Sequence, residues 1–228
     1  MQDKKTGPHQ SRRKLLLLGA AGIASSVFLT GCPLLFVGGT AMGVKTAMDR
    51  RSTKNQLEDQ NIELKAMQAL GSISGDSHIN VTSYNRQVLI TGEVPSAEKK
   101  SQVEQAITGI ATVRNVVNEL VVGPNTSISA RSNDTYITSK VKTIITSVEG
   151  VSTSDVKVVT ERSVVYLLGI LTAREAQIAG DAAASVAGVK KVVRMFEIIS
   201  EAQLQEFKSK TKTTEAQSIG SDGSKDVK

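Results

Sequence analysis

The stretch INVTSYNRQVLITG, residues 79–92, decides the fold, because it recurs without a gap as VKVVTERSVVYLLG at residues 156–169. Shorter matches flank it on both sides at nearly the same spacing, namely residues 110–117 with 186–193 and residues 62–65 with 137–140. The spacing changes by single residues only, so small insertions and deletions fall in loops. The sequence therefore predicts two copies of one structural unit.

Each copy shows the periodicity of two helices and three strands. Along the chain we expect a helix through 62–70 and 137–148, two strands joined by polar turns at 84–86 and 160–162, a helix at 96–109 and 173–187, and a last strand at 113–122 and 189–199. Gly92 and Gly169 are expected to close the second strand, and Thr172 with Glu175 has the spacing of a capping box. The predicted fold class is α+β, with two αββαβ units whose helices cover one face of a small mixed three-stranded sheet.

The start of the chain has the pattern of a bacterial secretory signal. Three basic residues at 12–14 precede an apolar run at 15–29. That run is shorter than the roughly 20 residues that cross a bilayer as a helix, so we predict a signal peptide at residues 1–31. Both Sec and twin-arginine export remain open.

The apolar run ends in Leu29-Thr30-Gly31-Cys32. This stretch resembles the lipobox of bacterial lipoproteins, with Thr30 a less common residue at its position. The resemblance implies that the signal is cut before Cys32, that Cys32 is diacylated and that its new amine is acylated. An ordinary signal peptide with a chance Cys, or an uncut anchor, is the alternative.

Composition limits the classes of function. Residues 1–31 contribute +4 of the formal charge of +6, so the chain from Cys32 onward carries only about +2 and has no Trp. This argues against nucleic acid as a partner. Cys32 is the only cysteine, which excludes disulfides. His78 has no second His or free Cys to join it, and no nucleophile elbow or P-loop is present. We therefore predict no enzyme, no cofactor and no metal site.

Charge distinguishes the two copies. Residues 57–122 hold five basic and eight acidic residues, whereas residues 133–200 hold eight basic and seven acidic residues. The second copy should therefore tolerate an anionic surface that the first copy avoids. Lys190, Lys191 and Arg194 form a basic cluster, which we interpret as lysines that protect an exposed strand edge.

The αββαβ unit, the Gly late in its second strand and the Gly-Val-x-x-Val entry into its third resemble the BON domain. Two such units behind a lipobox resemble the dual BON-domain outer-membrane lipoproteins, and the likeness extends to VGGTAMGVK at 37–45, DRRS at 49–52 and NDTYITSKV at 133–141. We predict a signal peptide at 1–31, a lipidated Cys and tether at 32–56, BON domains at 57–124 and 133–200 with a linker at 125–132, and an extension at 201–228 that is mostly disordered after a short helix.

The resemblance implies a site and a function. In the family, the second BON domain binds anionic phospholipid through its first helix, where Tyr136 holds the place of the leading aromatic. Lys140 and Thr143 follow on the same face at i+4 and i+7. From spacing alone, a solvated Lys beside a half-buried Tyr is the alternative.

The family's location and role follow from the same resemblance. We expect a protein that is lipid-anchored in the outer membrane and faces the periplasm, since Pro33 rather than Asp follows Cys32. Its expected role is to support membrane integrity, with concentration at division sites. The alternative is a lipid-tethered adaptor for outer-membrane assembly proteins.

Overall fold

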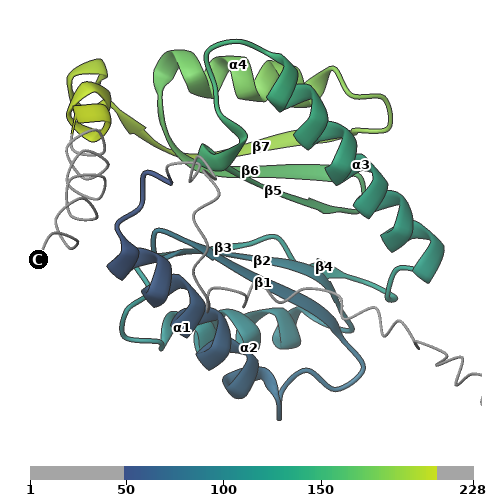
Figure 1. The fold of residues 1–228 in the computed structure, drawn as a ribbon. Coiled ribbons are helices and arrows are strands. Elements are labelled where there is room, and N and C mark those ends of the chain that lie inside the picture. The colour runs from purple at the N-terminus through teal and green to yellow at the C-terminus, as the bar shows by residue number, and fades with distance from the viewer. Residues whose placement is uncertain (1–48, 210–228) are drawn as a thin grey trace, which may run out of the picture. The chain divides into compact units, whose positions relative to one another are not determined.

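The structure is a computed structural model that describes residues 49–209 of the 228. The lipobox, Cys32 and most of the tether lie outside the described residues. The first unit contains α1 (Thr53–Leu70), β1 (His78–Tyr84), β2 (Gln87–Val94), α2 (Ala97–Thr108), β3 (Asn115–Asn118) and β4 (Val121–Val122). The second contains α3 (Ile128–Ser147), the 3₁₀ turn η1 (Thr153–Asp155), β5 (Val156–Glu161), β6 (Val164–Thr172), α4 (Ala173–Ala184) and β7 (Lys191–Ile199) (Figure 1).

The α+β fold with two αββαβ units is confirmed. In each unit an antiparallel hairpin, β1–β2 or β5–β6, is followed by a last strand parallel to its second member. In the first unit this last strand is interrupted, because the side chain of Asn118 accepts a hydrogen bond from the backbone N–H of Leu120. β3 and β4 therefore pair separately with β2.

The predicted helix starts were too late. α1 begins at Thr53, where the Ser52 side chain accepts from a backbone N–H, and α3 begins at Ile128 after the same cap by Ser127. α3 thus starts inside the segment 125–132 that the sequence analysis treats as a linker. The first turn of α1 is polar, and that of α3 has Ile128 exposed to solvent, so apolar periodicity gave no sign of either start. The capping box of Thr172 and Glu175 is confirmed. A short helix at 201–209 follows β7.

Gly92 and Gly169 were expected to close the second strand of each unit, and this prediction was wrong. Both residues lie inside their strands, β2 and β6. Gly92 has φ +115°, and a Cβ there would lie 1.9 Å from the carbonyl oxygen of His78 on the paired strand. A Cβ on Gly169 would lie 2.5 Å from the carbonyl oxygen of Asp155. Both positions therefore permit a close approach of backbone to backbone.

Each hairpin turn is held by a buried aspartate from the helix before it. Both central residues of each turn have positive φ, as a two-residue type I′ turn requires. Asp59 of α1 accepts from the turn N–H groups of Asn85 and Arg86 at 2.8 and 2.7 Å. In the second copy, Asp134 accepts from Arg162 and Ser163, both at 2.8 Å.

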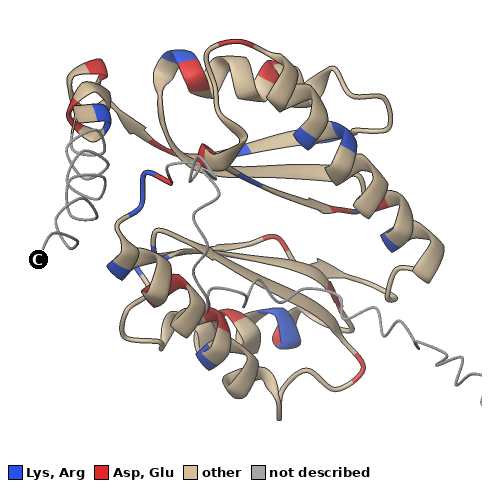
Figure 2. Cartoon of the chain, viewed as in Figure 1, with Lys and Arg blue, Asp and Glu red and all other residues tan. Residues whose placement is uncertain are grey.

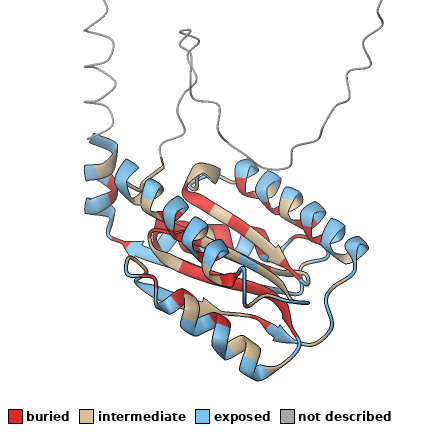
Figure 3. Ribbon diagram, turned by 90° about the horizontal axis from the view of Figure 1, so that it is seen from below, coloured by how far each residue is buried: buried red, intermediate tan, exposed pale blue. Residues whose placement is uncertain are grey.

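Each sheet buries both of its faces. One face packs under the two helices of its own unit, as predicted. The other faces contribute to one shared cluster, in which Tyr84 and Leu89 of the first unit join Tyr166 and Leu168 of the second. Along β2 and β6, successive side chains alternate between the cluster under the unit's own helices and the shared cluster. Figure 3 shows the resulting run of buried residues along the strands.

Candidate functional site

The outer face of α3 carries the predicted phospholipid contacts. Tyr136 is 63% exposed, Thr143 is exposed and Lys140 is half-buried. The Lys140 ammonium lies 5.4 Å from the centre of the Tyr136 ring and donates to the carbonyl of Ala187 at 3.0 Å. The Thr143 hydroxyl donates to Ser139 of its own helix. The three residues share the face that the spacing predicted.

The exposed charges of this helix are all of one sign. Its four charged residues are Arg131, Asp134, Lys140 and Lys142, and Asp134 is buried beneath the hairpin turn. Figure 2 shows the cations along α3. An aromatic side chain next to a cation, on a helix with two further exposed cations, suits the headgroup region of an anionic membrane, where each basic residue contributes about 1 kcal/mol.

The basic cluster on β7 has a different setting. β7 lies at the edge of its sheet, paired only with β6 within the described part of the chain. The guanidinium of Arg194 binds Asp181 at 2.9 Å and Gln177 at 3.2 Å. Lys190 and Lys191 are exposed. This arrangement fits our interpretation of a protected strand edge.

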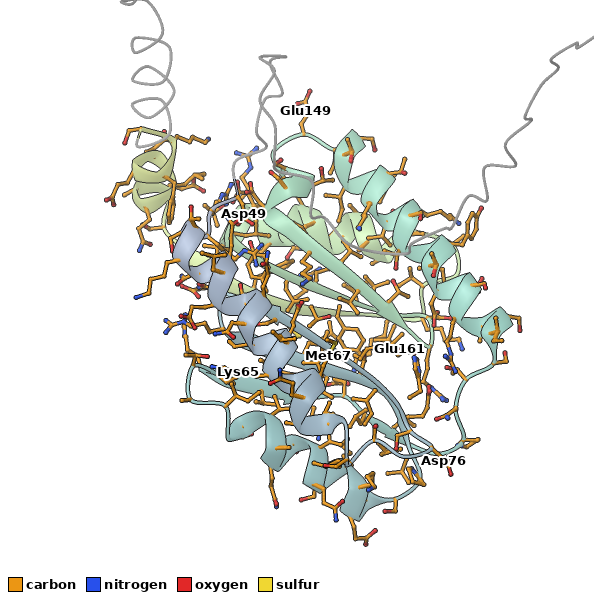
Figure 4. All side chains as sticks on the ribbon, turned by 60° about the horizontal axis from the view of Figure 1, so that its bottom comes forward. Asp49, Lys65, Met67, Asp76, Glu149 and Glu161 are labelled. Carbon is orange, nitrogen blue, oxygen red and sulfur yellow. The ribbon has the colours of Figure 1, made fainter. Side chains whose placement is uncertain are left out.

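Arg50 and Arg51 join the start of the described chain to both units. Arg50 forms two hydrogen bonds of 2.7 Å with Glu175 of α4, lies 3.0 Å from Asp155 and donates to the carbonyl of Ile170. Its side chain is only 8% exposed. Arg51 binds Asp59 of the first unit at 2.8 Å and lies over the ring of Tyr84. Asp49, labelled in Figure 4, pairs with Arg51. We call these two arginines the arginine clasp.

The electrostatics of the clasp follow from burial and pairing. Burial alone would lower the pKa of Arg50, but its hydrogen bonds to Glu175 and the charge of Asp155 raise it. The pKa of Glu175 is lowered, because Arg50 and the Thr172 N–H outweigh its burial. For Asp155 the effect of burial is larger than the effect of the Arg50 charge, so the pKa is raised to about 6. The Oδ1 atom of Asp155 has no hydrogen-bond partner among the described residues.

This pKa predicts how stability depends on pH. Asp155 holds its proton more tightly in the folded chain than in the unfolded chain, so the protein loses stability as pH rises from 3.8 to about 6. Asp155→Asn removes this titration. The variant is expected to be more stable than the unaltered protein by about 2 kcal/mol at pH 7.5, and equally stable near pH 3.5. Urea unfolding at a series of pH values measures both quantities, and a variant that is less stable at pH 7.5 would contradict the expectation.

From the sequence, DRRS at 49–52 was noted only as part of the resemblance to dual BON-domain lipoproteins. The two aspartates that bind the hairpin turns were missed. The signal for those aspartates was available, since Asp59 and Asp134 are separated by the same spacing as Ile62 and Ile137 in the repeat. No local signal could identify the clasp, because Arg50 and Glu175 lie 125 residues apart in the sequence.

Comparison with known proteins agrees with this architecture. The BON domain family model matches residues 58–124 and 133–200. The outer membrane lipoprotein DolP of Haemophilus influenzae is 35% identical over 191 residues, which cover 82% of this chain and 96% of that protein. The 21 kDa hemolysin of Actinobacillus pleuropneumoniae is 28% identical over 155 residues, which cover 67% of this chain and 80% of that protein.

The chain therefore belongs to the BON domain family and carries two BON domains in tandem. Within that class it belongs with the outer-membrane lipoproteins of the DolP type. Neither relative has the name of an enzyme. A solved structure of CdsD, a structural protein of the type III secretion system of Chlamydia trachomatis, covers 65% of this chain and 97% of its own at 10% identity and a TM-score of 0.26, and we draw no argument from it. No helix within residues 49–209 is long and apolar enough to cross a membrane.

Proposed function

We propose that this protein is a non-enzymatic lipoprotein, anchored through Cys32 in the outer membrane and facing the periplasm, whose second BON domain docks on anionic phospholipid. The observation that carries the proposal is the outer face of α3, where the exposed Tyr136 lies next to the Lys140 ammonium, on a helix whose one acid is buried. Through this contact the protein supports the integrity of the membrane, including at division sites.

Vesicle co-sedimentation tests the site. The compact unit Lys45–Lys228 is expected to sediment with vesicles of anionic phospholipid, to release with added salt and to stay in solution with neutral vesicles. Tyr136→Glu should weaken binding at least tenfold, because it replaces an interfacial ring by a repelled carboxylate. Gln68→Glu on α1 is the control, since Gln68 is exposed and lies in the other domain. An equal loss in both variants, or none in Tyr136→Glu, would contradict this site.

A second function rests on a separate observation. α1 exposes the large apolar side chains of Leu57, Leu64 and Met67, which are 61%, 49% and 66% exposed and recur along one side of the helix. Such a stripe, on the more acidic domain, favours contact with a protein of the outer-membrane assembly machinery. A photo-crosslinker at Leu64 that captures such a protein, and loses it in Leu57→Glu, would support the adaptor function.

A further inference from the structure

Three potential metal ligands from both domains meet where β1, β2 and β5 come together. His78 begins β1 and is paired in register with Glu93 of β2, while Glu161 ends β5 in the second domain. The His78 Nδ1 atom lies 3.1 Å from Glu93 Oε2 and 3.9 Å from Glu161 Oε1. One donor atom of each residue lies within 4.8 Å of the other two. Glu161 is labelled in Figure 4.

The two carboxylates are buried with little positive charge to offset them. The side chains of Glu93 and Glu161 are 0% and 7% exposed. Arg162 Nη1 lies 3.4 Å from Glu93 Oε1, with the Arg162 side chain 43% exposed, and Arg131 lines the cavity next to His78 and Glu161. Among residues 49–209 no hydrogen bond reaches Oε1 of Glu161, although this oxygen points at the His78 ring. A carboxylate oxygen that receives no hydrogen bond from the described residues and belongs to a residue lining a cavity, next to an imidazole and a second carboxylate, suits a cation.

The groups around the three residues orient them as outer partners of metal ligands do. Glu93 Oε2 accepts from the N–H and hydroxyl of Thr126 at 3.1 and 3.2 Å. The Asn80 amide lies 3.2 Å from His78 Nε2 and 2.9 Å from Glu161 Oε2. Because this amide nitrogen donates to Glu161, it also faces Nε2 as a donor, and Nδ1 carries the proton that it donates to Glu93 Oε2 at 3.1 Å. A metal ion bound at Nδ1 would take the place of that proton, between the ring and the two carboxylates.

A cavity of about 160 Å³ opens beside the cluster, next to His78, Asn80 and Glu161. Its lining also includes the charged residues Arg131 and Asp134 and three threonines, Thr135, Thr138 and Thr160. The cavity gives a metal ion a route of entry and gives water molecules room to complete its coordination.

We propose that His78, Glu93 and Glu161 bind one divalent transition-metal ion of the zinc class, with one nitrogen and two carboxylate ligands and with water in the remaining position. Ligand pairs in tetrahedral coordination lie about 3.4 Å apart for bonds of about 2.1 Å, close to the observed separations. Because Glu161 belongs to the second BON domain, the ion would link the two domains. The sequence argument against a metal at His78 considered only a second His or Cys and overlooked carboxylates that the fold supplies.

Zinc titration of the whole protein tests this proposal. The protein is extracted in detergent without a histidine tag, stripped with a chelator and titrated with Zn²⁺ against a chromophoric competitor. We expect one equivalent to bind and the unfolding temperature to rise with zinc. Glu161→Gln keeps the shape of its side chain and His78→Gln removes the imidazole ring, and each should weaken zinc binding at least tenfold.

Glu63→Gln is the matched control, since Glu63 also faces the other domain, through Lys157 at 3.0 Å, but lies outside the cluster. This variant should bind zinc as the unaltered protein does. Cobalt provides a readout independent of stability, because its visible absorption reports its ligands and should be lost in Glu161→Gln. Binding of less than one equivalent, binding unaffected by His78→Gln and Glu161→Gln, or equal loss in Glu63→Gln would overturn the proposal.

Discussion

Replacing Arg50 by alanine is expected to destabilise the protein by about 3–5 kcal/mol. Its guanidinium is the partner of two buried carboxylates, Glu175 and Asp155, whose side chains are 10% and 6% exposed. Without Arg50 both buried acids lose the guanidinium that pairs with them, and the carbonyl of Ile170 loses a donor. Chemical denaturation at pH 7.5, followed by far-UV circular dichroism, measures the loss.

Arg114→Ala is the control for this prediction. Arg114 also links the two domains, through Glu197 at 3.3 Å, but the two side chains are 48% and 45% exposed. A solvent-exposed pair of this kind contributes less than about 1 kcal/mol, so the variant should unfold close to the unaltered protein. If the two variants unfolded at the same denaturant concentration, burial would not explain the role of Arg50.

Gly92→Ala is expected to cost about 3 kcal/mol or more, because the backbone there is both left-handed and crowded. The new Cβ would lie 1.9 Å from the carbonyl oxygen of His78, and a backbone atom can move away only if β1 separates from β2. Since both strands belong to the first BON domain's sheet, the unfolding temperature should fall by many degrees.

Gly123→Ala provides the comparison for this second variant. Its Cβ would meet nothing within 4 Å and its φ is not positive, so a change within about 0.5 kcal/mol is expected. Differential scanning calorimetry of the three proteins measures the difference. A Gly92→Ala protein as stable as Gly123→Ala would show that the β1–β2 pair can relax without loss.

The local part of the fold could be predicted from the sequence. The repeat, the hairpin turns and the capping box at Thr172 depend on residues close together in the chain, so their patterns survive in a single sequence. The packing of one sheet on the other depends on residues far apart. The sequence nonetheless contains one sign of this packing. The residues of β6 are apolar along nearly the whole strand, which is typical of a strand buried on both faces.

The same distinction between local and distant residues applies to the candidate sites. The exposed face of α3 follows from helical spacing, so the placement of Tyr136 and Lys140 could be predicted, whereas their contact with phospholipid stays a prediction. The cluster at His78 could not be found in this way. Glu93 is a neighbour only across a hairpin, and Glu161 reaches the ring only after the two domains pack.

The long reach of the arginine clasp also bears on the order of events when the chain folds. The acidic residues that bind Arg50 are made 105 and 125 residues after it, so until then the first domain has one sheet face uncovered. Contacts of such separation slow folding and prolong the time in which apolar strands are open to mispairing. A chain whose synthesis stopped before Glu175 would be a substrate for chaperones and proteases, and both domains can close only after β7, which follows α4, has been made.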